Sequence, residues 1–415
     1  MDTNTKKLKI ACYSGSLSMS VVSNLSPLLF LTFRDLYGIS YSLLGLLILI
    51  NYISQLTIDL CFSFFSHKIN IPLIVKITPI ISIIGLLIYA LWPIIFNSNV
   101  YIGLVIGTII FSSASGFNEV LISPIIEALP SENKEREMSK LHSVFAFGVV
   151  GVMIIGTLFL LIFKKDNWPY LALLFTLIPL LSFIYFIQAK IPDFKSEKET
   201  YSVKSFISNK QMWLCAIAIF LGGAAEAAMS QWSSSYLERA FNIDKVWGDI
   251  FGVAIFALML GLGRYLYGRF GKNLEKVLLV GSIGASICYI LAIFVNVPIV
   301  GLLACGITGL CVSMLWPGTL SVVTKRVVPC GVFVFALMAA MGDLGAAISP
   351  QLVGVVTDGV IESLWAIDVA NSLSISVEQL SMRVGMLFGL IFPLLGIIVF
   401  SIIYKSKNKE EKSCH

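Results

Sequence analysis

The chain has 415 residues, of which 57% are hydrophobic and 13% charged, whereas soluble domains average about 45–50% apolar and about 25% charged residues. These proportions exclude an ordinary soluble protein, and the high hydrophobic content excludes an intrinsically disordered chain. The formal net charge is +5, but no basic stretch interleaved with aromatic residues accompanies it, so we expect no nucleic-acid partner. The composition instead predicts a lipid bilayer as the partner of this chain.

Hydrophobic segments long enough to cross a bilayer follow one another along the chain, separated by polar clusters or by Pro and Asn breaks. In the first half, spans are expected at residues 10–33, 41–65, 73–95, 100–128, 140–163 and 168–189. In the second half, they are expected at residues 210–237, 247–267, 275–295, 298–323, 331–359 and 383–404. The sequence therefore predicts an all-α membrane protein with twelve transmembrane helices in two six-helix halves.

Lysine and arginine are distributed unevenly between the segments that connect the spans. Twenty-two of the 29 fall in the two termini and in alternate loops, six fall in the intervening loops, and Arg264 lies inside a span. Because cationic loops resist translocation, this pattern predicts that both termini are cytoplasmic and that the protein lies in the cytoplasmic (inner) membrane. The alternation also supports an even number of spans.

A lysine-rich segment without an apolar core separates the two predicted halves, which is typical of a linker. The predicted parts are an N-terminal half at 1–189, a cytoplasmic linker at 190–209, a C-terminal half at 210–404 and a cytoplasmic tail at 405–415. The other loops leave no room for a soluble catalytic domain, and no phosphate-binding loop motif occurs, so we expect neither an enzyme nor direct coupling to ATP. In the segment 361–382, Ser376 and Gln379 have the spacing of a capping box for a short helix that leads into the last span.

Two prolines occupy corresponding positions in the two halves. Pro124 lies near the end of the fourth predicted span and Pro317 near the end of the tenth, and each is followed by a second proline before a charged loop. Matched helix-breaking positions indicate an internally repeated transporter that binds its solute between the halves, near the bilayer centre. Chance is the alternative, because proline is common in membrane helices.

Four carboxylates fall well inside predicted spans: Asp59, Glu119, Glu226 and Asp343. Each costs at least about 2.5–3.5 kcal/mol on insertion scales, so each needs a partner or a function. Arg264, near the cytoplasmic end of its span, is a candidate gating residue but cannot neutralise all four carboxylates. We therefore expect proton coupling through some of them. The alternatives are a static hydrogen-bonded carboxyl at Glu119 and a proton that Asp343 shares with Asp59, holding their helices together.

Polar residues of the fourth span fall largely on one helical face, which we expect to border a cavity. This face carries Asn118, a candidate solute ligand, together with Glu119 and Glu127. His142, at the start of the fifth span, could approach Glu127 near the cytoplasmic surface. For these two residues we favour a structural or gating pair over proton transport.

The seventh span contains the sequence GGAAEAAMSQWSSSYLE, in which Glu226, Gln231 and Trp232 interrupt a run of small residues. Small residues allow close helix packing, but they do not explain a carboxylate, an amide and an indole near the bilayer centre. Hydrogen bonds to hydroxyl groups, with an aromatic ring against the apolar side of a sugar ring, would hold a sugar-like solute. Further candidate ligands, each of which could instead be a packed polar residue, are Asn24, Asn51, Gln55, Trp316 and Gln351.

The loop after the eighth span, Gly268-Arg269-Phe270-Gly271-Lys272, resembles the second copy of the loop motif of the major facilitator superfamily, and Arg269 would be a gating residue there. The first copy, at 67–70, is degenerate. More specifically, the segments NEVLISPIIEALP, KLHSVFAFG, WPG and GDLG resemble the fucose–proton symporter branch of that superfamily and its bacterial sugar-permease-like relatives. The resemblance covers essentially the whole chain and implies a twelve-helix transporter fold.

The resemblance also implies roles for two residues. A glutamate five residues before a proline on the fourth helix is linked to proton movement in that branch, and the matching residue is Glu119, ahead of Pro124. The polar residue near the cavity at the start of the fifth helix matches His142. The fucose symporter also has a carboxylate in its first helix, whereas the segment 23–27 has none. This departure argues against fucose as the substrate.

Taken together, these features predict a monomeric secondary transporter that moves a small polar solute, a sugar or sugar derivative, inward with protons by alternating access. An exporter of amphipathic compounds is the alternative, because buried acids would serve an antiporter equally well. A nutrient sensor is disfavoured, since the short tail offers little as an output element. The eight cysteines lack the close spacing of metal ligands, so we expect no metal, cofactor or disulfide.

Overall fold

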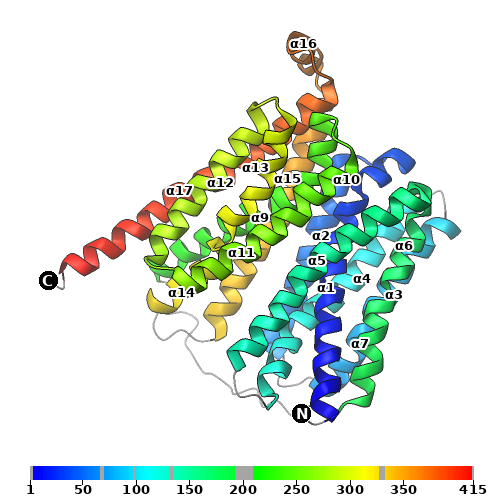
Figure 1. Ribbon diagram of the computed structural model, residues 1–415, viewed down its shortest axis with the longest axis vertical. Coiled ribbons are helices and arrows are strands. Elements are labelled where there is room, and N and C mark those ends of the chain that lie inside the picture. The colour runs from blue at the N-terminus through cyan, green and yellow to red at the C-terminus, as the bar shows by residue number, and fades with distance from the viewer. Residues whose placement is uncertain are drawn as a thin grey trace. The chain divides into compact units, whose positions relative to one another are not determined.

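The computed structural model describes residues 3–65, 70–96, 99–130, 134–191, 209–326 and 332–413, and all regular structure in these ranges is helical (Figure 1). Twelve helical segments are long and apolar enough to cross a membrane, which confirms the predicted fold class. The helices of the first half are α1 (Thr3–Tyr37), α2 (Tyr41–Phe65), α3 (Ile71–Ile95), α4 (Val100–Ala128), α5 (Lys134–Phe163), α6 (Trp168–Phe175) and α7 (Leu177–Gln188). Those of the second half are α9 (Lys210–Phe241), α10 (Lys245–Trp247), α11 (Ile255–Phe270), α12 (Leu274–Phe294), α13 (Pro298–Val312), α14 (Leu315–Arg326), α15 (Val332–Ile361), α16 (Leu364–Ser372) and α17 (Val377–Ser413).

Three of the spans are built from more than one helical segment. The sixth comprises a 3-10 turn at Lys165–Asn167 followed by α6 and α7, and its break at Thr176 precedes Pro179, which cannot donate a backbone hydrogen bond. The eighth comprises α10, a π-helical turn at Gly248–Ala254, and α11. The tenth comprises α13 and α14.

The ends of the first and last spans differ from the sequence-based expectation. The first helix begins at Thr3 rather than residue 10, so it includes the lysines that flank its apolar stretch. At the last span, the side chains and backbones of Ser376 and Gln379 exchange the two hydrogen bonds of a capping box, at 2.9 and 3.0 Å. This box caps α17 itself, and the separate short helix α16 precedes it at the ends of α15 and α17 (Figure 1).

The structure divides into two compact units. Unit 1 comprises Met1–Ile39 and Ile50–Lys198, and unit 2 comprises Ser40–Leu49 and Glu199–His415. The first residues of α2 therefore pack with unit 2, and the rest of α2 packs with unit 1. Most of the predicted linker lies outside the described residues.

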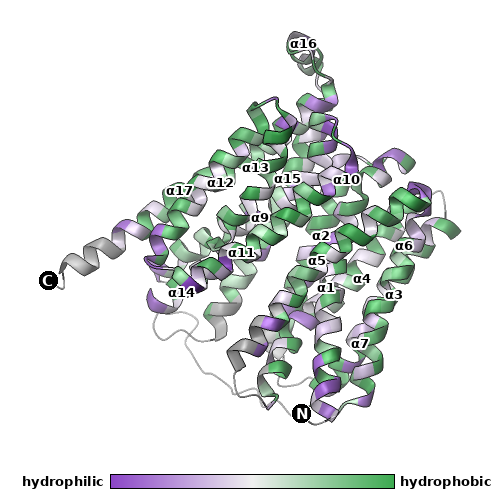
Figure 2. Ribbon diagram, in the orientation of Figure 1, coloured by the Kyte–Doolittle hydropathy of each residue, from purple (hydrophilic) through white to green (hydrophobic). Residues whose placement is uncertain are grey.

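Burial separates the helices inside each unit into two classes. The most apolar 18-residue window is 83% buried in α1 and 72% buried in α9, against 39% in α5 and 44% in α17. Helices that pack against protein on most sides contact little lipid, so their surfaces need not be apolar. The same windows of α1 and α9 are less apolar than those of α5 and α17, as the hydropathy colours of Figure 2 let the reader follow. The polar side chains of α1 and α9 are therefore positioned against protein.

Candidate functional site

The break in the tenth span exposes a backbone carbonyl. Because Pro317 has no N–H, the carbonyl of Ser313, four residues earlier, lacks its helical donor, and α13 ends at Val312. Arg264 of α11 supplies the missing hydrogen bond, since its Nε donates to the Ser313 oxygen at 3.1 Å. In contrast, α4 continues through Pro124 as one helix. The two prolines match in sequence position but not in local structure.

The same arginine faces one of the buried acids. Nη2 of Arg264 lies 4.0 Å from Oε2 of Glu226 on α9, and the two side chains are 47% and 25% exposed. Gly263 lets α11 approach the end of α13, because a Cβ there would lie only 2.2 Å from Oγ of Ser313. The predicted gating residue Arg264 thus pairs with Glu226, and both side chains remain partly accessible.

Two glycines, one on α9 and one on α15, pack against the indole of Trp316. A Cβ on Gly342 would lie 2.4 Å from the ring of Trp316, and a Cβ on Gly223 would lie 3.0 Å from it. The glycines also let α9 and α15 approach closely, since the same Cβ on Gly223 would lie 2.5 Å from the carbonyl oxygen of Gly342. Glu226 follows Gly223 by three residues and so shares its helical face. Asp343, next to Gly342, is buried.

Trp232 is packed inside the protein in this structure, and its role as a solute ligand remains a prediction. Its ring is fully buried, its Nε1 donates to the carbonyl of Pro350 at 2.9 Å, and it packs edge-on to Tyr41 with centroids 5.9 Å apart. The small residues of α9 bring α15 close to this face, so the indole fills the helix interface. The neighbouring Gln231 is also buried. Gln351 of α15 lies half-buried, and a Cβ on Gly45 of α2 would lie 3.0 Å from its Oε1.

The amides of unit 1 form a hydrogen-bonded chain between helices. Nδ2 of Asn51 donates to the carbonyl of Val22 at 3.0 Å, Nε2 of Gln55 donates to Oδ1 of Asn51, and Ser115 donates to Oε1 of Gln55 at 3.0 Å. This chain links α1, α2 and α4. Asn24 donates to a carbonyl of its own helix at 2.9 Å. The contacts support the packed-polar reading for Asn24, Asn51 and Gln55.

A pair of acids faces the same helix contact. The Asp59 carboxyl of α2 interacts electrostatically with the Glu119 carboxyl of α4. Gly116, one turn before Glu119, lets α4 approach α2. A Cβ on Gly116 would lie 3.0 Å from the Cβ of Ile58 and 3.0 Å from the carbonyl oxygen of Gln55. Glu119 is exposed and Asp59 half-buried, while Asn118 is buried. Unit 1 thus brings two carboxyl groups into electrostatic interaction, whereas unit 2 pairs an acid with a base.

The remaining predicted residues give less information. Arg269 is exposed and contacts its own helix, donating to the hydroxyl of Tyr265 at 3.0 Å and lying 5.5 Å from the ring of Phe270. Glu127 and His142 belong to α4 and α5, but their side chains lie outside the part of the chain that the structure describes. Their proposed pairing therefore remains a prediction.

Sequence reasoning missed a set of charged contacts at the start of α2. The backbone N–H groups of Tyr41 and Ser42 donate to the two carboxylate oxygens of Asp358 at 3.0 and 2.6 Å. The Tyr41 hydroxyl donates to Glu378 at 2.6 Å, and Arg239 lies 3.8 Å from the same carboxylate. A carboxylate at a helix N-terminus is electrostatically favourable. No local signal announces these contacts, because the partners are more than 300 residues from α2.

Asp249 is a further buried acid that sequence reasoning missed. It lies in the π-helical turn and is fully buried, where Ser234 donates to it and Lys245 pairs with it at 3.0 Å. The spacing of four residues between Lys245 and Asp249 was the available signal. Among the described residues, no group of three His, Cys, Asp or Glu could hold a metal ion.

Comparisons with known proteins agree with this architecture. The family model described as Major Facilitator Superfamily matches residues 11–350. No curated protein shows a significant match to the sequence.

Several solved structures share the fold. A variant of the nucleoside transporter NupG is 13% identical, with 96% of this chain and 100% of that chain covered and a TM-score of 0.74. An inward-facing, occupied bacterial homologue of the human lysosomal transporter Spinster is 13% identical, with 97% of each chain covered and a TM-score of 0.73. A D-xylose–proton symporter is 15% identical, with 94% and 96% covered and a TM-score of 0.66. At these identities, the likeness shows the fold alone.

Proposed function

Because the chain belongs to the major facilitator superfamily, we propose that this multi-pass secondary transporter carries a sugar or sugar derivative inward, together with protons, by alternating access. The specific resemblance to the fucose–proton symporter branch motivates the substrate class. Two of the structural neighbours are a nucleoside transporter and a D-xylose–proton symporter. A nucleoside is itself a sugar derivative, so both compounds belong in the panel of solutes to be tested.

The observation that carries the proposal is the ion pair between Glu226 and Arg264. Their separation of 4.0 Å exceeds hydrogen-bond length, so the two groups attract each other without using their hydrogen-bonding capacity on each other. A solute hydroxyl between them could donate to the carboxylate and accept from the guanidinium. The ring of Trp316, which packs against Gly223 one turn before Glu226, replaces Trp232 as the aromatic contact in this proposal.

Proton coupling is assigned to the two acids of unit 1. The carboxyls of Asp59 and Glu119 interact as like charges, and binding one proton relieves their repulsion. Glu119 is the more exposed member of the pair, and proton exchange is assigned to it. Asp343 remains a second candidate, and the pairing of Asp343 with Asp59 remains a prediction.

We also propose the topology that the charge distribution favours. Cytoplasmic termini in the inner membrane, with residues 190–209 as a cytoplasmic linker, account for the 22 cations on one side. The transporter is proposed to act as a monomer and to need no cofactor. Labelling of introduced cysteines at the two termini from either side of intact cells would test the orientation.

The function is tested by counterflow in proteoliposomes that contain the purified full-length protein. We expect radiolabelled pentoses, hexoses or nucleosides to exchange, and an imposed inward proton gradient to drive accumulation of the same solute. Glu226→Gln should weaken exchange of that solute, whereas Glu362→Gln, a change of equal charge outside the proposed site, should not. Failure of every sugar and nucleoside, combined with proton-driven extrusion of lipophilic cations, would instead establish the exporter.

A further inference from the structure

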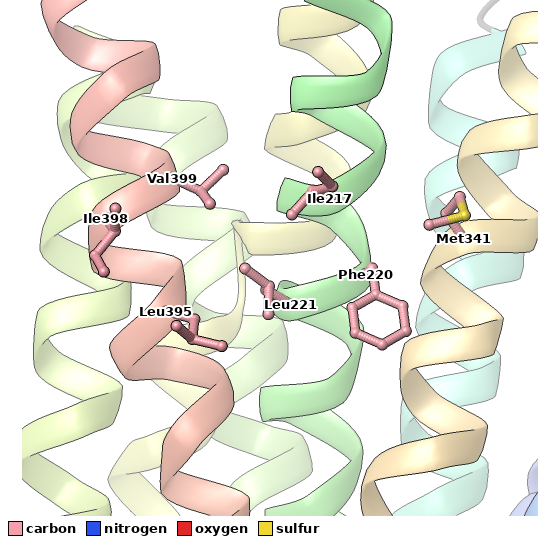
Figure 3. Close-up of a pocket in the computed structure, with 7 residues that line it drawn as sticks. All are labelled: Ile217, Phe220, Leu221, Met341, Leu395, Ile398 and Val399. Carbon is pink, nitrogen blue, oxygen red and sulfur yellow. The ribbon is translucent and has the colours of Figure 1, made fainter. Parts of the chain in front are cut away.

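An apolar groove lies between α9, α15 and α17 of unit 2. Its volume is about 390 Å³, within the range of about 300–1,000 Å³ that small-molecule pockets occupy. Figure 3 shows side chains of α9 and α17 pointing toward each other across it, with Met341 of α15 at one side. The lining residues are Ile217, Phe220, Leu221, Met341, Leu395, Ile398 and Val399. All of them are apolar.

The side chains on both walls are open at the surface. Ile217 on α9, and Leu395 and Ile398 on α17, are exposed. In a membrane-spanning unit, exposed aliphatic side chains at this depth contact lipid tails rather than water. The groove is therefore a concave apolar surface that an acyl chain can enter.

Cations lie at the end of the same two helices. On α9, Lys210 precedes Ile217 by seven residues and so lies on its face, and on α17, Lys405 follows Ile398 by seven residues. Both lysines are exposed. Arg326 of α14 joins the two helices there.

Among the described residues, the hydrogen-bond partners of Arg326 are neutral. It donates to the carbonyl of Ile403 at 2.8 Å, to Ser406 at 2.6 Å and to Gln211 at 3.4 Å, all of them neutral acceptors. Within the ranges that the structure describes, no carboxylate forms an ion pair with Arg326, Lys210 or Lys405. The groove thus ends at three cations that attract an anion.

We propose that the groove and these three cations form a binding site for an anionic phospholipid. One acyl chain lies between α9 and α17, and the phosphate group lies against Lys210, Lys405 and Arg326. Basic pockets between transmembrane helices bind anionic lipid headgroups in this way. The exposed indole of Trp213, between Lys210 and Ile217 on α9, lies where interfacial aromatic residues contact headgroups.

Charge and shape together identify this occupant. An apolar segment of a second protein copy would leave the three cations unmatched, and a free phosphate would leave the apolar groove empty. A neutral or zwitterionic lipid would fill the groove with less attraction at the cations. The site is independent of the proposed transport function, since it shares no residue with the Glu226–Arg264 pair.

The test is native mass spectrometry of the full-length protein released from detergent with phosphatidylglycerol and phosphatidylethanolamine of identical chains. The wild type should bind phosphatidylglycerol at least fivefold more tightly than phosphatidylethanolamine. The double variant Lys210→Gln, Lys405→Gln should lose that preference. The matched control Lys272→Gln, Lys276→Gln removes two exposed lysines from the same unit and should retain it.

A second pair of variants tests the groove itself. Ile398→Trp fills the groove and should reduce binding of phosphatidylglycerol, whereas Ile287→Trp places the same ring at an exposed position of α12 and should not. Soluble glycerol phosphate should fail to displace the lipid. Equal binding of the two lipids, equal loss in test and control variants, displacement by glycerol phosphate, or a dimer that Ile398→Trp dissociates would each overturn the proposal. Melting temperatures in detergent identify any variant that fails to fold, and the other variant pair then decides the result.

Discussion

The carboxylates inside the membrane spans have different partners in the two units. In unit 1, Asp59 and Glu119 interact as like charges where α2 and α4 meet. In unit 2, Glu226 faces the guanidinium of Arg264 at 4.0 Å. A glycine lies near each contact: Gly116 lets α4 approach α2, and Gly263, next to Arg264, lets α11 approach the end of α13. The partner, rather than the acid, distinguishes the two regions.

This difference separates two tasks. Two neighbouring acids gain from binding one proton, because the proton removes their mutual repulsion. An acid that faces a base is already compensated, so protonation would break an attractive pair. The first arrangement suits proton exchange, and the second suits binding of a polar solute through a donor and an acceptor of opposite charge.

The largest expected effect is on coupling in unit 1. Glu119→Gln should abolish proton-driven accumulation while solute exchange continues, because exchange can return the loaded carrier without deprotonation. Parallel measurements of uptake under a pH gradient and of counterflow would separate the two. Glu119→Asp, which keeps the acid, should retain partial accumulation. Uphill uptake by the glutamine variant would remove Glu119 from the coupling mechanism.

In unit 2, the same type of substitution should act on affinity. Glu226→Gln should weaken solute binding by about 10-fold to 100-fold, or about 1.4–2.8 kcal/mol, because a charged hydrogen-bonding group is lost. Arg264→Lys keeps the positive charge and should cost less. Binding can be measured by tryptophan fluorescence or by the concentration dependence of counterflow. If both variants bind the solute as tightly as the wild type, the site lies elsewhere.

The fold could be predicted from sequence because span length and loop charge are local properties. The close approach at Gly342 was also readable, since two glycines flank Asp343 in the segment GDLG. The sequence does not predict which face of a helix packs against protein when most of the residues of that helix are small. The two tryptophans illustrate this limit, because Trp232 is fully buried whereas Trp316 is half-buried against Gly223 and Gly342.

Long-range partners were the second limit. The residues around Arg264 do not predict its hydrogen bond to Ser313, and those around Tyr41 do not predict the hydrogen bond to Asp358. The effect of a proline also depends on such partners. At Pro317 the helix is broken, and Arg264 donates a hydrogen bond to the Ser313 carbonyl that lacks its helical donor. At Pro124, in contrast, α4 continues.

A further carboxylate, outside the spans, extends the comparison to an acid with two bases. Glu137 of α5 accepts hydrogen bonds from Lys140 at 2.8 Å and from Lys9 of α1 at 2.5 Å, which lowers its pKa to about 2. Glu137→Gln should lower the stability of unit 1 by about 1–2 kcal/mol without changing coupling. The reference is Lys140→Gln, which removes the more exposed lysine and should cost less.

The pH dependence of that stability follows from the direction of the shift. Because the pKa of Glu137 is depressed in the folded protein from its ordinary value of 4.5 to about 2, its contribution is complete above pH 4.5 and is lost as the pH falls toward 2. The difference in melting temperature between wild type and Glu137→Gln should therefore be constant from pH 6 to pH 8 and should shrink below pH 4.5. A difference that grows on acidification would contradict the ion-pair assignment.

The smallest effect should come from the prolines, which test whether the backbone break matters to the ion pair. Pro317→Ala restores an N–H that can donate to the Ser313 carbonyl. This N–H would compete with Arg264 for the oxygen, so Arg264 would be held less firmly beside Glu226. Solute affinity should fall about threefold to fivefold, which is under about 1 kcal/mol. Pro124→Ala is the matched control, because α4 is already continuous there, and it should change affinity less than twofold. Equal effects of the two substitutions on counterflow would mean that the break in the tenth span does not position Arg264, and the contrast between the two units would then rest on the side chains alone.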